Sequence, residues 1–155
     1  MLVMAAGQLA GGVAWLAISG EDAPDLVATA PVAAGLLLRA KIEAVMGAIA
    51  VVFAPFLIAL ALAAPVTAIV AALGIVAAAA TATTIQLWFR AQAKRSHFRR
   101  RQTSSRLATF AEAFSSIAWA GTAALAAAGT WLAVLAGVIA LAILAGTRLI
   151  SPARD

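Results

Sequence analysis

Few residues of this chain have side chains that could carry out catalysis or bind a metal. The sequence contains six acidic residues, one histidine and no cysteine. Without cysteine there can be no disulfide framework, thiolate metal site or cysteine nucleophile. His97 lies in a basic segment, with no second histidine and no acidic cluster near it in sequence, so we expect an exposed loop residue, neither a metal ligand nor the base of a serine nucleophile. The phosphate-binding pattern G-x-x-x-x-G-K-[ST] is absent, so we expect no P-loop ATP hydrolysis, no enzymatic activity and no cofactor.

One acidic residue, Glu112, lies about six residues into an apolar stretch that begins near Leu107, within reach of a membrane interface. Ionisable residues within membrane segments are candidates for function, because burying a charge in lipid is costly. Two roles are open for Glu112. It can pair with Arg106 or reach the membrane interface, or it can contact a transported substrate or proton. Glu43 and Arg148 lie nearer the ends of their apolar stretches, so we expect both at the interface.

The composition indicates a membrane protein. Hydrophobic residues make up 65% of the chain and charged residues 11%, and the mean hydropathy is +1.04, whereas soluble domains carry roughly a quarter charged residues. A span needs about 20 apolar residues, and the apolar runs are continuous, which favours helices over a barrel. We predict an all-α, polytopic transmembrane bundle that forms a single domain over 1–155. Its expected spans number about five: 2–19, 42–64, 65–89, 107–129 and 131–150.

The basic residues fall in or beside three hydrophilic segments, 20–41, 90–106 and the C-terminal tail. With five spans these segments lie on the same side, while the turns near 64–65 and 129–131 carry no charge. Positively charged segments stay in the cytoplasm. We therefore expect a multi-pass protein of the bacterial inner membrane with a cytoplasmic C-terminus and the lipid bilayer as a partner. The eleven basic residues are Arg39, Lys41, Arg90, Lys94, Arg95, Arg99, Arg100, Arg101, Arg106, Arg148 and Arg154.

Within the basic segment 90–106 we expect an anchor that fixes topology and contacts anionic lipid. Arg95, Arg99, Arg100 and Arg101 are its central residues, and each basic residue near such a surface contributes about 1 kcal/mol. Docking of a partner protein is an alternative. We do not expect nucleic acid to bind, because the segment holds one aromatic residue and is tethered between two spans.

The segment 20–41 carries the most specific pattern. Three acids come first, and Asp22 can cap a short helix whose first turn holds Pro24. Pro31 disfavours helix in the preceding residue and so separates this helix from the next. The second helix carries a leucine run, and Arg39 and Lys41 are expected to extend to the interface as it enters the membrane.

This pattern resembles the permease subunits of type-2 ABC exporters. The matching positions are Glu21, Asp25-Leu26-Val27, Ala30-Pro31-Val32, Leu36-Leu37-Leu38 and Lys41. Ile18-Ser19-Gly20 stands where that family carries a charged stretch, and Ala33 and Ala34 replace its polar or basic residues. In that family the element contacts a separate ATPase subunit, and alternating access drives export. The resemblance implies a coupling role here for Glu21, Asp22, Asp25, Leu26, Pro31 and Lys41.

The resemblance also bears on the extent of the chain and on its partners. Because the first apolar stretch starts at the first residue, we expect the C-terminal part of a longer permease; a protein with its N-terminus outside is the alternative. Association with other permease helices, as a homo- or hetero-oligomer, is compatible with either. A plain interfacial linker at 20–41 would instead make the chain a non-catalytic membrane scaffold or assembly protein. The substrate stays open.

Overall fold

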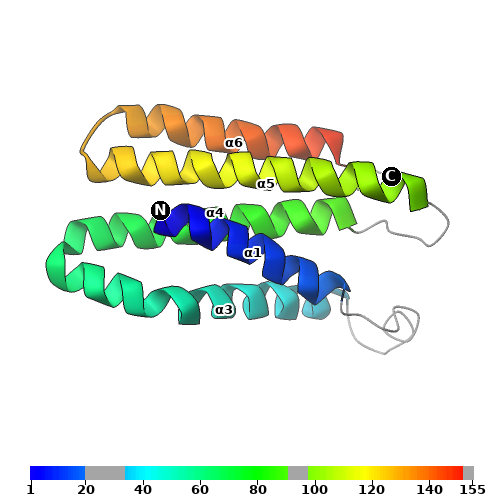
Figure 1. The fold of residues 1–155 in the computed structure, drawn as a ribbon, viewed down its shortest axis with the longest axis horizontal. Helices are drawn as coiled ribbons and strands as arrows, with labels where there is room; N and C mark the ends of the chain where they lie inside the picture. Colours follow the sequence, from blue (N-terminus) through cyan, green and yellow to red (C-terminus); the bar gives the residue numbers. More distant parts are fainter. Residues whose placement is uncertain (20–33, 91–97, 152–155) are drawn as a thin grey trace.

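The structure is a computed structural model that describes residues 1–19, 34–90 and 98–151. In the described part of the chain all regular structure is helical, which confirms the prediction of an all-α fold. The helices, labelled as in Figure 1, are α1 (Leu2–Ser19), α3 (Ala34–Ala63), α4 (Pro65–Arg90), α5 (Phe98–Ala127) and α6 (Leu132–Ile150).

Two short turns divide the apolar sequence into helical hairpins. Pro65 is the first residue of α4, a position where its missing N–H costs nothing and its fixed φ suits a helix. Gly129 follows α5 with φ 68°, a conformation that glycine adopts without strain. The backbone N–H groups of Gly129 and Thr130 donate to the carbonyls of Ala126 and Leu125, each at 3.0 Å. This pair of bonds is a Schellman cap, and it ends α5 at the turn.

The four helices α3, α4, α5 and α6 lie in a row in chain order, and α1 lies across one face of that row (Figure 1). α1 contacts α4 most extensively and also contacts α3 and α5. Both short turns lie at one end of the bundle (Figure 1). At the other end, the charged end, lie the C-terminal ends of α1, α4 and α6 and the N-terminal ends of α3 and α5. The alternation of sides expected from the sequence is therefore present in the fold.

Three of the described helices are long and apolar enough to cross a membrane: Gly35–Ala63, Pro65–Phe89 and Leu132–Ile150. The chain is thus membrane-embedded by length and composition, but the predicted count of about five spans is too high on this measure. The apolar part of α1 is the shorter Leu2–Ile18. The apolar half of α5 is interrupted by polar residues, which lower its hydropathy; these are Glu112, Ser115, Ser116 and Thr122.

Two helices begin inside the hydrophilic segments. α3 begins at Ala34, within 20–41, where the sequence predicted a second helix that continues into the membrane, and α5 begins at Phe98, within 90–106. Charged residues end a membrane span, but they need not end a helix, because Arg, Lys and Glu favour helix about as well as leucine does.

Small residues let α1 lie close to its neighbours. Its buried residues Val3, Ala6, Ala10 and Ala14 recur every three or four positions and so form one stripe along the helix. This stripe packs on larger side chains of α3 and on alanines of α4; the members of this core are Val45, Ile49, Phe53, Ile75, Ala78, Ala79 and Ala82. Most other large apolar side chains point outward, as expected where lipid is the solvent.

Candidate functional site

The interior of the bundle contains a layer of polar side chains between α1, α4 and α5. Six polar residues on the two longer helices are less than a tenth exposed; they are Thr81, Thr83, Gln86, Glu112, Ser115 and Ser116. Buried polar groups in such a setting are stable only if they are hydrogen-bonded. The hydrogen-bond partners of each group therefore indicate which of these side chains stabilise the bundle and which could bind a proton or a polar ligand.

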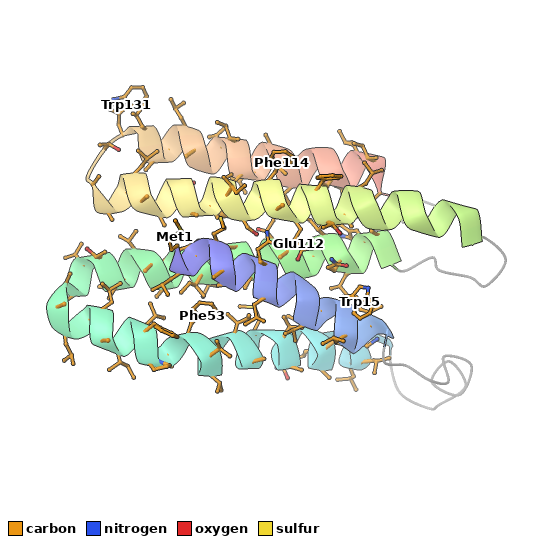
Figure 2. The ribbon with its side chains drawn as sticks, viewed as in Figure 1. Met1, Trp15, Phe53, Glu112, Phe114 and Trp131 are labelled. Atoms are coloured by element: carbon orange, nitrogen blue, oxygen red, sulfur yellow. The ribbon has the colours of Figure 1, made fainter. Side chains whose placement is uncertain are left out.

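Glu112 lies at the centre of the layer, between α5 and the helices beside it (Figure 2). Its side chain is 5% exposed, and its Oε2 accepts a hydrogen bond of 2.7 Å from Nε2 of Gln86 on α4. Of the two roles open from the sequence, reaching the membrane interface does not match this burial, and the side chain of Arg106 lies outside what the structure describes. A carboxyl group held by an amide can bind a proton or a polar group. The other role, contact with a transported substrate or proton, therefore stays open.

α1 accommodates the carboxylate because it presents glycine to it. A Cβ added at Gly11 would overlap Oε1 of Glu112, and one at Gly7 would overlap Oγ of Ser116. Gly12, one residue further on, has nothing within 4 Å of such a Cβ. The G-x-x-x-G step in α1, which is weak evidence in a sequence so rich in small residues, thus faces the polar side chains of α5.

A second pair of polar groups lies deeper in the bundle. The indole Nε1 of Trp119 donates to Oγ1 of Thr81 at 3.0 Å, and Thr81 donates in turn to the carbonyl of Ala77 at 2.7 Å. Ser116 donates to the carbonyl of Glu112 at 2.8 Å. Ser115, 1% exposed, has no hydrogen-bond partner for its hydroxyl within the described structure. The α4–α5 interface is therefore polar from Glu112 as far as Trp119.

Charged side chains cluster at the charged end of the bundle. Arg39 and Glu43, one turn apart on α3, form an exposed ion pair at 2.6 Å. The guanidinium of Arg148 on α6 lies 4.8 Å from the ring centroid of Trp88 on α4, a cation–π contact. Arg148 lies two residues before the end of α6, and Glu43 lies in the first third of α3.

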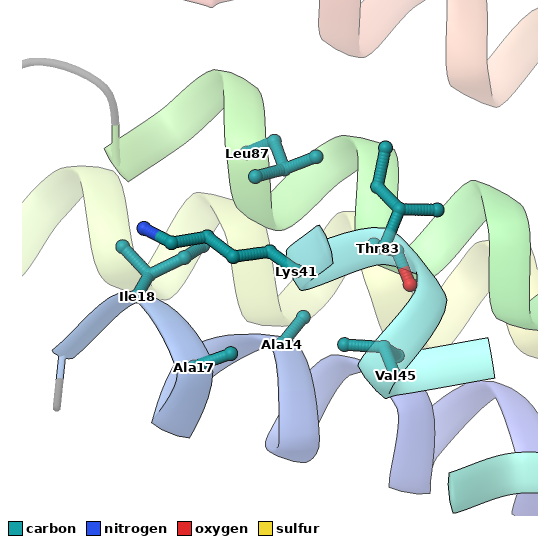
Figure 3. A pocket seen from close by; sticks show the side chains of 8 residues that line it. Ala14, Ala17, Ile18, Lys41, Val45, Thr83 and Leu87 are labelled. Carbon is teal, nitrogen blue, oxygen red and sulfur yellow. The ribbon is translucent and has the colours of Figure 1, made fainter. Parts of the chain in front are cut away.

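Lys41 lines a small void among α1, α3 and α4 (Figure 3). Its side chain extends past Ile18 toward the end at which α1 and α4 terminate, which is the direction expected for a lysine reaching the interface. The void measures about 10 Å³, room for at most one water molecule. It is a packing defect rather than a ligand site.

The structure does not test the other predicted site residues. Glu21, Asp22, Asp25, Leu26, Pro31 and Arg95 lie outside the described residues. Arg99, Arg100 and Arg101 form the first turns of α5, but their side chains are not described. Among the residues that the structure describes, no group of three or more His, Asp or Glu could hold a metal ion.

Gln86 is the residue of this site that the sequence did not single out. It lies within the third predicted span, 65–89, near the charged end. It is the only residue of α4 between Pro65 and Phe89 with a carboxamide, which was the available signal. Comparison of the chain with protein-family models, curated proteins and solved structures found no match.

Proposed function

We propose that the chain is the membrane-spanning component, or part of one, of an ABC-type exporter in the bacterial inner membrane. It couples to a separate ATPase through the segment 20–41, and its charged end faces the cytoplasm. The proposal is supported by the resemblance of this segment to type-2 permeases. The observation that carries it is the arrangement of helix ends: the segment 20–33 connects α1 to α3 at the same end as the basic segment 90–106.

Helix length supports a protein surface outside the lipid at this end. α3 and α5 each have 30 residues and are about 45 Å long at 1.5 Å per residue. The hydrocarbon core is about 30 Å thick, which leaves roughly 15 Å of each helix outside it. The excess lies at the charged end, because Arg39 and Glu43 lie near the start of α3 and the arginine run lies at the start of α5. An ATPase would dock on this side.

The packing of α1 would allow docking of the ATPase to change the structure inside the membrane. Force applied to 20–33 would act directly on the C-terminal end of α1 and the N-terminal end of α3. α1 is held against α5 by Gly7 and Gly11, so its movement would change the environment of Glu112. In alternating access, such a shift is coupled to the ATPase cycle. Small-residue interfaces permit it, because few interlocking side chains oppose sliding.

The test is a detergent pull-down of a candidate P-loop ATPase, sought among the genes that neighbour this one. Reversal of two acids, Asp22→Lys with Asp25→Lys, should weaken recovery of the ATPase, because charges at a docking surface orient the partner. Glu43→Lys is the matched control, since it reverses an exposed acid just past the segment. Equal recovery with the double variant and the parent protein would refute coupling through this segment and leave a non-catalytic membrane scaffold as the function.

A further inference from the structure

The carboxyl group of Glu112 contacts two neighbouring helices at once. Its Oε2 accepts the hydrogen bond from Nε2 of Gln86 on α4, and its Oε1 lies against Gly11 on α1. Glu112 and Gln86 are 5% and 6% exposed. Figure 2 shows Glu112 among α1, α4 and α5. The carboxyl group therefore lies in the interior of the bundle, with an amide as its hydrogen-bond partner.

A carboxamide can bond to a carboxyl group in either protonation state. Its N–H donates to an oxygen of the carboxylate or to the C=O of the acid, and its own carbonyl oxygen can accept the O–H of the acid. A buried charge needs electrostatic compensation, whereas a buried acid needs only hydrogen bonds. A lysine or arginine in place of Gln86 would instead favour the carboxylate alone. The Gln86–Glu112 pair can thus stay hydrogen-bonded with or without a proton.

The position of Glu112 along α5 places it nearer the charged end than the turn end of the membrane. Glu112 lies fourteen residues after Phe98, the start of α5, or about 21 Å along the helix. Since roughly 15 Å of α5 extends beyond the hydrocarbon at this end, the residue lies roughly 6 Å inside the hydrocarbon boundary. Ala127 at the other end of α5 is about 22 Å away. A proton from the charged end therefore has the shorter path.

The charged groups on the surrounding helices also lie toward the charged end. α1 has no Asp, Glu, Lys, Arg or His between Leu2 and Ser19. Arg90 is the last residue of α4, and the basic residues of α5 end at Arg106; these arginines are the cations that could hold Glu112 as a carboxylate. On α6, Arg148 lies against Trp88. The charged residues of α3, which packs against α1 and α4, are Arg39, Lys41 and Glu43.

We propose that Glu112 is a proton-binding site in the interior of the membrane. Its carboxylate takes up a proton from the charged end and releases it to the same side, with Gln86 hydrogen-bonded to it in both states. The O–H bond of the acid is the only covalent bond that forms or breaks. Because Gly11 lies against Oε1, the charge changes where α1 meets α5. This site does not depend on the exporter function, since it requires only the buried pair.

The test is infrared difference spectroscopy of the full chain in lipid vesicles, because the C=O stretch of a protonated carboxyl group is separate from the amide bands. Glu21→Gln with Glu43→Gln leaves Glu112 as the sole glutamate. Glutamate labelled with ¹³C at its side-chain carboxyl then identifies the band of Glu112 by its isotope shift. Glu112→Gln, which keeps the shape of the side chain but binds no proton, is the control. Circular dichroism checks that each variant is folded.

The isotope-sensitive band should disappear as the pH rises between about 4 and about 9, a range that covers exposed and buried glutamates. It should be absent from Glu112→Gln. Gln86→Leu should move the midpoint of this titration by about one pH unit or more, because the hydrogen bond to the charged form is the stronger one. Gln8→Leu changes the same type of side chain at an exposed position of α1 and should leave the midpoint unchanged.

Two simple outcomes would overturn the proposal. A band that persists at every pH would mean a permanently protonated acid, and no band at any pH would mean a permanent carboxylate. A band that appears only after Arg90→Gln with Arg106→Gln would also overturn it, since an ion pair would then hold the carboxylate. An unchanged midpoint in Gln86→Leu would contradict the role of Gln86 as the partner of both forms.

Discussion

Nε2 of Gln86 donates a hydrogen bond of 2.7 Å to Oε2 of Glu112, and this bond joins α4 to α5 at a point where both side chains are buried. The two residues are 26 positions apart in the sequence. They place an ionisable group and an amide in the interior of a bundle whose outer surface is apolar. The bond makes α4 and α5 a unit against which α1 packs.

Loss of the amide should destabilise the bundle. We expect Gln86→Ala to lower the free energy of unfolding in detergent micelles by about 1–2 kcal/mol, because the buried carboxyl loses a hydrogen bond that water cannot replace. Gln8→Ala, which removes the same group from an exposed position on α1, is the control and should change stability little. Equal effects of the two substitutions would contradict a structural role for the Gln86–Glu112 bond.

A methyl group on α1 should disturb the same contact. Gly11→Ala forces its Cβ onto the carboxylate of Glu112, and overpacking of this kind costs about 1–3 kcal/mol. We expect a lower melting temperature in detergent, partly restored when Glu112→Ala is added. Gly12→Ala, with open space around its Cβ, should be neutral or slightly stabilising, because alanine favours helix over glycine. Failure of Glu112→Ala to restore any stability would mean that the two residues are not in contact.

The proposed orientation can be tested by cysteine labelling, for which the chain offers a cysteine-free background. Ala128 lies in the turn between α5 and α6, and Ser96 in the basic segment between α4 and α5. An impermeant maleimide added outside intact cells should label a cysteine at Ala128 and not one at Ser96. Permeabilised cells, where both should react, supply the control. Labelling at Ser96 alone would reverse the orientation and refute a cytoplasmic charged end.

The arginine run at the start of α5 should contribute to membrane attachment. Replacing Arg99, Arg100 and Arg101 by glutamine removes at most about 3 kcal/mol of attraction to an anionic surface. We expect weaker anionic-lipid binding and disturbed topology before any loss of partner binding. Gln102→Ala with Thr103→Ala changes the same turn without altering its charge. This control should leave anionic-lipid binding and topology unaffected. If the triple variant keeps its lipid affinity and topology, the run is not an anchor.

The sequence alone determined that the chain is helical, membrane-embedded and charged at one end. These properties are local or compositional: continuous apolar runs cannot satisfy their backbone in lipid except as helices, and Pro65 and Gly129 restrict the backbone wherever they occur. The positions of the two turns were therefore predictable. The start of α5 was not, because the basic segment 90–106 was expected to be a loop, whereas α5 begins at Phe98 within it.

Only the tertiary structure decided which small and polar residues meet. Gly11 and Gly12 are neighbours of the same type, yet a Cβ at Gly11 would overlap Glu112 and one at Gly12 would meet nothing within 4 Å. Trp119 meets Thr81 across 38 residues of sequence. Such contacts depend on how each helix is rotated about its axis and how far it is shifted along its neighbour. In a chain so rich in alanine the apolar pattern barely distinguishes one face from another, so rotation and shift are set by packing across the whole bundle.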